Sequence, residues 1–153
     1  MQALELKIPP VVLLAIFGLA MWLLAQQVPA LAVPMSWRLL LAGIFAIAGI
    51  AIAMSGVLAF RRANTTVDPR VPQQSSSLVI RGIYRYSRNP MYVGFLLLLI
   101  AWAFYLSSAA ALALLPLFVL YMNRFQIAPE ERFLLQKFGA EYQAYLTRVR
   151  RWL

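Results

Sequence analysis

Two polar clusters interrupt an otherwise apolar chain, and they hold the side chains around which a site would form. The first cluster, RGIYRYSRNPMYVG, covers residues 81–94, and the second, NRFQIAPEERFLLQKFGAEYQAYL, covers residues 123–146. Their polar groups are tyrosines, arginines, amides and a few carboxylates, which form hydrogen bonds and hold charged groups. The clusters therefore have the residue types of a binding site, and they offer few side chains for catalysis.

The catalytic options are narrow because the chain has no histidine, no cysteine and only five acidic residues. These absences exclude disulfides, zinc–thiolate sites, cysteine nucleophiles and histidine general bases. We expect no metal site. Any enzyme built from this chain must leave the difficult chemical step to a cofactor or to an already activated substrate.

The composition is that of a membrane protein. Hydrophobic residues make up 63% of the 153-residue chain, and the mean hydropathy is +0.74. A soluble domain is usually about half apolar, so we expect one all-α integral membrane domain covering residues 1–153. The net charge is +9, but the basic residues flank apolar runs, as they do in membrane proteins. We therefore expect membrane lipids as partners and no nucleic acid.

The first sixty residues contain two apolar runs, 8–25 and 39–60. About 20 apolar residues cross the hydrocarbon core of a bilayer, so each run predicts a spanning helix. A cleavable signal peptide is the alternative for the first run, which is long for that purpose. The second run carries small residues that predict close helix packing, namely Gly43, Gly49 and Gly56.

The third uncharged run, residues 91–122, is too long for one crossing and barely long enough for two. Ser107 and Ser108 interrupt it near the middle, and Pro116 interrupts its second half. The pattern predicts a helical hairpin of two short spans, near residues 91–106 and 109–122. One long tilted helix is the alternative.

Charge placement predicts the topology. Arginines crowd the connector, residues 61–90, and basic residues recur in the tail, residues 123–153, whereas residues 26–37 carry none. The positive-inside rule then predicts four spans, with both termini and the connector on the cytoplasmic side.

The tail itself predicts a helix. Pro129 and the two glutamates after it suit a first helical turn. The apolar side chains that follow recur at helical spacing, with arginines on the other side. We therefore expect an amphipathic helix on the membrane surface, bent or divided at Gly139.

The predicted hairpin has a consequence for the two polar clusters. A hairpin returns its ends to one place, so the clusters should be neighbours although the hairpin separates them in the sequence. Taken singly, each of their residues also has a purely structural explanation, such as an orientation signal, an interfacial anchor or a helix start. Their pairing favours a site.

The paired clusters also match a known pattern. The first reads G-x-Y-x-x-x-R-[HN]-P-x-Y-x-G, and after an apolar hairpin the second reads E-E-x-x-L-x-x-x-F-G-x-x-Y-x-x-Y. The chain matches it with Gly82, Tyr84, Arg88, Asn89, Pro90, Tyr92, Gly94, Glu130, Glu131, Leu134, Phe138, Gly139, Tyr142 and Tyr145. This pattern resembles the isoprenylcysteine carboxyl methyltransferase and phospholipid methyltransferase superfamily. The resemblance covers roughly residues 76–150.

The resemblance implies an integral membrane enzyme that uses S-adenosylmethionine at the cytoplasmic edge of the bilayer. Transferring the motif position by position assigns the cofactor pocket to Ser77, Leu78, Val79, Tyr84, Asn89, Pro90, Tyr92 and Glu130. Glu130 would accept hydrogen bonds from polar groups of the cofactor, whereas Glu131 would cap the helix or support the site. The catalytic candidates are Glu130, Arg88 and Arg124, of which the arginines either hold an anionic acceptor or anchor to lipid phosphates.

Two departures from the family pattern bear on the chemistry. Many relatives have histidine at the position of Asn89, and asparagine does not titrate, which favours binding over proton transfer. The carboxyl methyltransferases have arginine at the position of Gln126, so the isoprenylcysteine substrate itself is in doubt. Tyrosine rings at positions 84 and 92, and Trp102, are candidates to stabilise the cationic sulfonium.

We therefore expect methyl transfer from S-adenosylmethionine to a small or lipophilic acceptor, either an isoprenylcysteine-type carboxylate or a lipid amine. A thiol acceptor is the third option, although amines and thiols need a base that this chain offers only in its glutamates and tyrosines. Two rivals remain. One is a non-catalytic membrane scaffold or partner subunit that kept the fold, and the other is a related membrane reductase.

Overall fold

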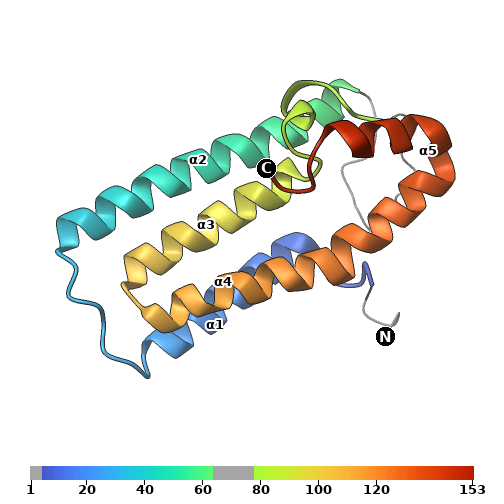
Figure 1. The fold of residues 1–153 in the computed structure, drawn as a ribbon. Helices are drawn as coiled ribbons and strands as arrows, with labels where there is room; N and C mark the ends of the chain where they lie inside the picture. Colours follow the sequence, from blue (N-terminus) through green and yellow to red (C-terminus); the bar gives the residue numbers. More distant parts are fainter. Residues whose placement is uncertain (1–4, 64–77) are drawn as a thin grey trace.

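The computed structural model of the chain describes residues 5–63 and 78–153, and this part of the protein is built from helices alone. Figure 1 shows their order and arrangement. The helices are α1 (Pro10–Ala25), α2 (Met35–Arg62), the 3₁₀ turn η3 (Gly82–Arg85), α3 (Pro90–Leu106), α4 (Ala109–Tyr121), the π-helical segment η4 (Met122–Ile127) and α5 (Ala128–Arg148).

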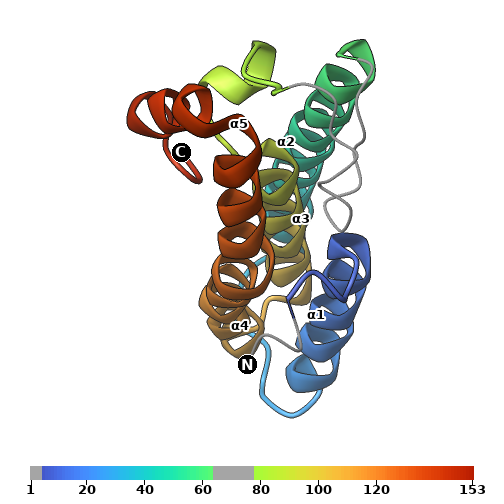
Figure 2. The same ribbon diagram turned by 90° about the vertical axis from the view of Figure 1, so that its right-hand side faces the viewer.

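The long helix α2 lies along α3, and α1 lies along α4, in a bundle whose helices run roughly parallel or antiparallel (Figures 1 and 2). Leu13 and Met21 of α1, Leu99 of α3 and Phe118 of α4 are buried together in the core. Phe17 meets Phe118 edge to face, with ring centroids 5.3 Å apart. The prediction of an all-α bundle is confirmed.

Glycines allow the close approach of α2 and α3. Of the three glycines that the sequence predicted to pack closely, Gly49 and Gly56 do so. A Cβ atom on Gly49 would lie 2.8 Å from the carbonyl oxygen of Gly94, and one on Gly56 would lie 2.8 Å from the Met91 side chain. Gly43 has no described atom within 4 Å of such a Cβ, so its predicted packing role is wrong. Near this position α2 contacts α3 through side chains instead, since the Phe45 and Phe104 rings stack with centroids 5.4 Å apart.

The third apolar run forms a hairpin rather than one long helix. Ser107 ends α3 in the left-handed conformation, with φ at 51°, and the Ser108 hydroxyl accepts a hydrogen bond from the Ala111 N–H to cap α4. Ser107 also bonds Leu31 twice, through its carbonyl and its hydroxyl. The turn therefore joins the α3–α4 hairpin to the loop between α1 and α2. Pro116, by contrast, does not interrupt α4, which runs past it.

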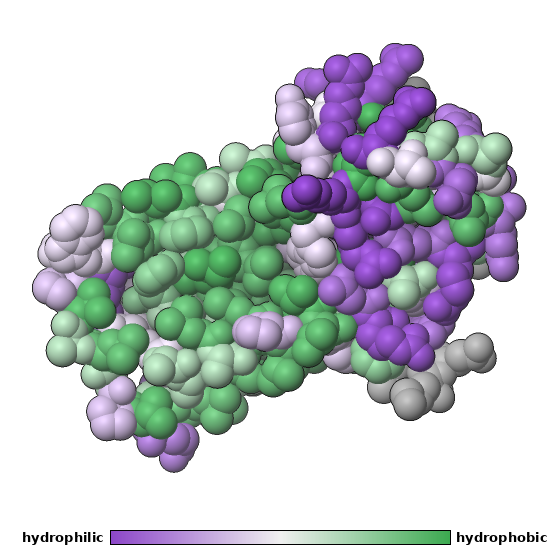
Figure 3. All heavy atoms as spheres, in the orientation of Figure 1, coloured by the Kyte–Doolittle hydropathy of each residue, from purple (hydrophilic) through white to green (hydrophobic). Residues whose placement is uncertain are grey.

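Among the described residues, two helical stretches are long and apolar enough to cross a membrane: Met35–Arg62, and Ala109–Arg148, whose uncharged part ends before Arg124. The apolar helices α1 and α3 are shorter. Figure 3 shows hydrophobic side chains covering the body of the bundle, with hydrophilic ones gathered at one end. The chain therefore has the surface of a membrane protein, and the count of four spans stays a prediction.

The predicted tail helix does not begin at Pro129, because the chain is already helical there. The chain is helical through α4, η4 and α5 without a break, so Pro129 and the two glutamates lie inside a helical path and not at a free first turn. Proline lacks an N–H and so leaves the carbonyl four residues earlier without its helical donor. That carbonyl, on Phe125, accepts a hydrogen bond from the Leu6 N–H at 3.0 Å. The N-terminal segment thus satisfies the group that Pro129 frees.

The predicted bend at Gly139 is confirmed. Gly139 has φ 50° and ψ −122°, a conformation that side chains other than hydrogen rarely adopt. Beyond it the helix folds back, and the chain end marked C in Figure 1 returns to the start of α3. Whether this part of α5 lies on a membrane surface stays a prediction.

Candidate active site

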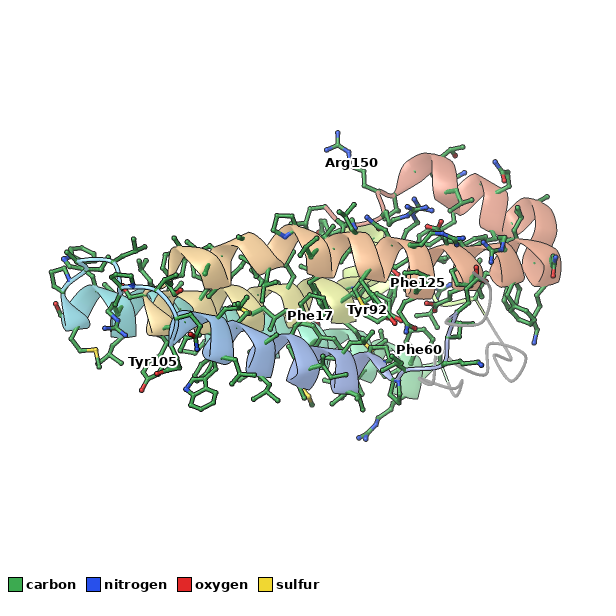
Figure 4. The ribbon with its side chains drawn as sticks, turned by 90° about the horizontal axis from the view of Figure 1, so that it is seen from below. Phe17, Phe60, Tyr92, Tyr105, Phe125 and Arg150 are labelled. Atoms are coloured by element: carbon green, nitrogen blue, oxygen red, sulfur yellow. The ribbon has the colours of Figure 1, made fainter. Side chains whose placement is uncertain are left out.

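The two polar clusters meet at the hydrophilic end of the bundle. Tyr92, on the first turn of α3, donates a hydrogen bond from its hydroxyl to Oε2 of Glu130 on α5, at 3.3 Å across 38 residues of sequence. Tyr92 is 3% exposed, and Figure 4 shows its ring in the interior of the bundle. The prediction that the hairpin brings the clusters together is confirmed.

Glu130 lies beyond the apolar run of residues 91–122, in a partly buried position. Burial raises the pKa of Glu130 to about 7, because a carboxylate loses its hydration there. The hydrogen bond from Tyr92 acts in the opposite direction, and the neighbouring charge of Glu131 raises the pKa further. The group is therefore close to half ionised near neutral pH, and a cation bound beside it would favour its charged form.

Two further tyrosines, Tyr84 and Tyr142, lie near this carboxyl group, and Tyr145 contacts both of them. Burial and the nearby charge of Glu130 raise the pKa of Tyr84, so its hydroxyl stays protonated. The Tyr84 ring packs edge to face on Phe60 of α2, with centroids 5.3 Å apart. Tyr145 donates a hydrogen bond to the Tyr84 carbonyl at 2.7 Å, and burial raises the pKa of Tyr142 beside it. Tyr84, Tyr92 and Tyr142 are thus the tyrosines that lie near Glu130 among the described residues.

Glu131 lies between two guanidinium groups. Its Oε1 is 3.0 Å from Arg88 and 3.1 Å from Nε of Arg151, and its Oε2 is 2.5 Å from the second nitrogen of Arg151. The side chains of Glu131 and Arg88 are 17% and 14% exposed. Arg88 is thus within the site but holds Glu131, and its buried Nε has no hydrogen-bond partner among the described residues.

Asn89 and Pro90 form the corner between the connector and α3. Pro90 is the first residue of α3, where a missing N–H costs nothing, and it is buried. The side-chain nitrogen of Asn89 donates to the carbonyl oxygen of Arg151 at 2.9 Å. Asn89 therefore lies at the site as predicted, with its donor engaged by the C-terminal segment.

The other predicted cofactor residues lie on the segment before η3. Val79 is buried and Leu78 is partly buried, on the approach to the 3₁₀ turn that carries Tyr84. Ser77 lies outside the described residues. The structure brings Tyr84, Tyr92 and Glu130 together, and the Leu78–Val79 strip precedes the turn that carries Tyr84.

Three residues that the sequence suggested lie elsewhere. Arg124 is half-exposed and pairs with Glu5 at 3.1 Å, and Gln126 is fully buried with its amide nitrogen on the Ile8 carbonyl at 2.8 Å. Trp102 donates to the Gly18 carbonyl, about 15 Å along α3 from Tyr92 at 1.5 Å per residue. Arg124 and Gln126 thus bond the N-terminal segment, and Trp102 lies farther along α3.

Comparison with known proteins identifies the family. The family model for phospholipid methyltransferases matches residues 37–141, which is well over half of the chain and includes both polar clusters up to Glu141. The chain belongs to the phospholipid methyltransferase family. The resemblance seen in the sequence is therefore confirmed, and the protein is a membrane methyltransferase in the general sense of that family.

This phospholipid methyltransferase family member is also similar to an uncharacterised protein of Haemophilus influenzae. The two are 48% identical over 63 residues, which is 41% of this chain and 100% of that protein. No solved structure matches the chain.

The sequence did not predict the contacts of two further residues, Arg151 and Asn123. Arg151 was read only as part of a basic tail on the membrane surface, and Asn123 only as part of the second cluster. Asn123 accepts a hydrogen bond from the Trp152 indole N–H at 3.0 Å. Their roles depend on the tail folding back onto α3, for which neither helical periodicity nor residue spacing gave a signal. Tyr142 and Tyr145 did carry a signal, since a spacing of three residues places both on one helix face.

Proposed function

We propose that the protein transfers a methyl group from S-adenosylmethionine to a lipophilic acceptor at the hydrophilic end of the bundle. The observation that carries the proposal is the Tyr92–Glu130 pair, a partly buried carboxyl group enclosed by tyrosine rings inside a phospholipid methyltransferase domain. Such a site favours a small organic cation. The cofactor is one, since it carries a sulfonium and an amino group.

The residues present fit this cofactor. A carboxyl group with a pKa near 7 becomes ionised when a cation binds beside it, and aromatic rings attract cations with about 0.5–2 kcal/mol each. Glu130 would hold the cationic part, with Tyr84 and Tyr92 as the rings. Glu131 does not compete for this role, because two guanidinium groups already neutralise it.

The chemistry asks little of the chain. The cofactor supplies a methyl group on a sulfonium, which is already activated for in-line displacement. The chain's own residues bind and orient the two reactants and exclude water, which lowers the entropic part of the barrier. This division of work agrees with a chain that has no histidine and no cysteine.

Among acceptors, we propose a lipid amine. The family name supports a phospholipid acceptor. The position at which carboxyl methyltransferases have an arginine is Gln126 here, a neutral side chain committed to the Ile8 carbonyl. A lipid would reach the site sideways from the bilayer, and the cofactor would enter from the cytoplasm, where the positive-inside rule places the basic end.

Calorimetry with S-adenosylhomocysteine in detergent tests the cofactor. Glu130→Gln and Tyr92→Phe each remove one partner of the pair, and we expect affinity to fall about tenfold or more, as for a lost charge-assisted hydrogen bond. Glu141→Gln is the matched control, because Glu141 is an exposed carboxylate on the same helix. Unchanged affinity in both site variants contradicts the site assignment.

A second experiment tests the acceptor. Membranes that contain the protein are supplied with methyl-labelled S-adenosylmethionine, and the labelled lipids are treated with alkali. Methyl esters release the label and methylamines keep it, so we expect an alkali-stable product. An alkali-labile product points to a carboxylate acceptor.

A protein that binds no S-adenosylhomocysteine would favour the scaffold rival, and nicotinamide-cofactor binding would favour the reductase.

A further inference from the structure

The last residues of the chain form a strap that returns to the site. Helix α5 ends at Arg148, and Val149 is extended, with φ −125° and ψ 134°. Residues 149–152, called the strap below, then run back to the start of α3, where Figure 1 places the C-terminal end. The strap therefore connects the far end of α5 to the wall that carries Asn89 and Tyr92.

The strap bonds directly to the first wall of the site. The Arg150 carbonyl accepts a hydrogen bond from the Arg88 N–H at 3.0 Å. The Arg151 carbonyl accepts one from the side-chain nitrogen of Asn89 at 2.9 Å. These two bonds are made by consecutive strap residues to consecutive wall residues, so they hold the strap in one register beside α3.

The strap also bonds to the second wall. The Arg151 guanidinium makes two hydrogen bonds to Glu131, at 3.1 and 2.5 Å, and Glu131 adjoins Glu130. Trp152 is partly buried against the core, and its indole N–H bonds Asn123 on η4. The side chain of Arg150, in contrast, points away from the helices in Figure 4. Arg151 and Trp152 are thus side chains of the strap that bond the rest of the molecule.

The ion pair matters to the charge of the site. Glu130 and Glu131 are adjacent carboxyl groups, and two neighbouring negative charges oppose each other's ionisation. Arg88 and Arg151 together neutralise Glu131, and a bidentate guanidinium fixes the plane of the carboxylate as well as its charge. Without the Arg151 side chain, Glu131 keeps one cationic partner, Arg88. The bond from Asn89 goes to the Arg151 backbone carbonyl, so it is lost only if the strap leaves its place.

We propose that the strap completes the methyl-donor site, with Arg151 as a positioning residue that holds Glu131 and Asn89 so that Glu130 can bind the cofactor. This inference rests on the function proposed above. The strap bridges the two walls from outside, and a cofactor held between them is enclosed by it. Arg151 touches neither reactant and acts through the residues that it holds.

The proposal predicts a change in pH dependence that loss of fold alone does not produce. Glu130 is faced by Tyr92 from α3, by Tyr84 from η3, and by Glu131 and Tyr142 from its own helix. Burial raises the pKa of Tyr84 and the pKa of Tyr142, so these two hydroxyls stay protonated and Glu131 is the charged neighbour of Glu130. Removing Arg151 exposes Glu130 to more of that charge and raises its pKa. Cofactor affinity should then reach its plateau at higher pH.

The test compares Arg151→Gln with Arg148→Gln in the full chain in detergent. Arg148 is the last residue of α5 and is exposed, so its replacement removes the same charge outside the strap. We expect Arg151→Gln to weaken S-adenosylhomocysteine binding about tenfold, as for lost bidentate hydrogen bonds to a carboxylate, and to move the pH midpoint upward. Arg151→Lys keeps the charge without the planar fork and should restore the midpoint and part of the affinity.

A distance measurement reports on the strap without any cofactor. The chain has no native cysteine, so Tyr86→Cys and Leu153→Cys, at side chains 73% and 74% exposed, take a pair of spin labels cleanly. We expect one narrow distance distribution in the parent chain and a broad one after Arg151→Gln, with a circular-dichroism spectrum that stays helical.

The outcomes separate the two proposals. Equal affinity and equal pH midpoint in Arg151→Gln and Arg148→Gln, with a parent chain that binds, overturn the role of the strap and leave the proposed function standing. A parent chain that binds no S-adenosylhomocysteine overturns the proposed function and the strap's part in it. A broad distance distribution in the parent chain shows that the strap is not docked and also overturns the inference.

Discussion

Glu130 is the residue on which the site depends, and its neighbours explain why it is not an ordinary surface carboxylate. Burial opposes its charge, while the Tyr92 hydroxyl stabilises that charge through a hydrogen bond. Its neighbour Glu131 differs only in its partners, which are two guanidinium groups. Two adjacent glutamates therefore take different roles because the fold surrounds one with rings and the other with cations.

Cofactor binding should depend on pH through Glu130. The pKa of Glu130 is raised to about 7, so below pH 7 the group is mostly protonated and loses its attraction for a cation. Ionisation follows one proton, so we expect S-adenosylhomocysteine affinity at pH 6 to be roughly tenfold lower than at pH 8. Calorimetry across this pH range measures the affinity. In Glu130→Gln the affinity should be weak and should not change with pH. A profile that keeps its slope in Glu130→Gln assigns the titration to another group.

The motif predicted which residues lie at the site better than it predicted what they do. Tyr92 and Glu130 meet as expected. Asn89 is present, but its amide bonds the strap, and Arg88 supports Glu131. Arg124 pairs with Glu5 of the N-terminal segment. Partners of this kind come from segments far apart in the sequence, so residue type and spacing carry no trace of them.

At the scale of the elements, η4 lets α4 continue into α5. A π-helical segment adds a residue to a helical turn, and such segments often lie beside functional sites. Here the segment ends just before Pro129, and Leu6 takes up the carbonyl that the proline leaves without a donor. The helix that carries Glu130 is therefore held at its start by the N-terminal segment, to which Glu5 adds ion pairs with two arginines.

The contact between α2 and α3 should tolerate no side chain at Gly94. A Cβ there would lie 2.6 Å from the Gly49 carbonyl oxygen and 2.7 Å from the Cβ of Ala53. We expect Gly94→Ala to lower the free energy of unfolding by about 1–3 kcal/mol, the usual cost of overpacking. Thermal unfolding in detergent measures the loss.

Gly43→Ala is the control for this contact, since no described atom lies within 4 Å of its added Cβ. It should unfold at the parent temperature or slightly above it. If Gly94→Ala proves as stable as Gly43→Ala, the two helices are not packed as closely as the glycines require.

At the scale of the whole molecule, one end is hydrophilic and the body is hydrophobic (Figure 3). The described start of the chain, the start of α3 and the strap all lie at the hydrophilic end, while the Ser107–Ser108 turn lies at the other (Figure 1). Arg38 is the basic residue near that opposite end. Its Nε and one terminal guanidinium nitrogen both donate hydrogen bonds to the Tyr105 carbonyl at the end of α3. The Arg38 guanidinium thus bonds a backbone carbonyl of the same chain.

We expect the hydrophilic end to face the cytoplasm. Single cysteines in a chain that has none can show this, with Tyr86→Cys near the site and Val33→Cys in the loop between α1 and α2, both at exposed side chains. A membrane-impermeant maleimide should label Tyr86→Cys only in inside-out vesicles and Val33→Cys only in right-side-out vesicles. Labelling of both from one side rules out this topology.

The sequence by itself determined the family of the protein and the meeting of its two polar clusters. Apolar runs, the serine break and the paired polar motifs are local patterns, and they predicted the helices, the hairpin and the meeting of Tyr92 with Glu130. Only the tertiary structure decided that the tail runs on from α4, turns at Gly139 and returns as a strap that pairs Arg151 with Glu131. A return of that kind depends on where a long helix ends in space, and residue spacing holds no such information.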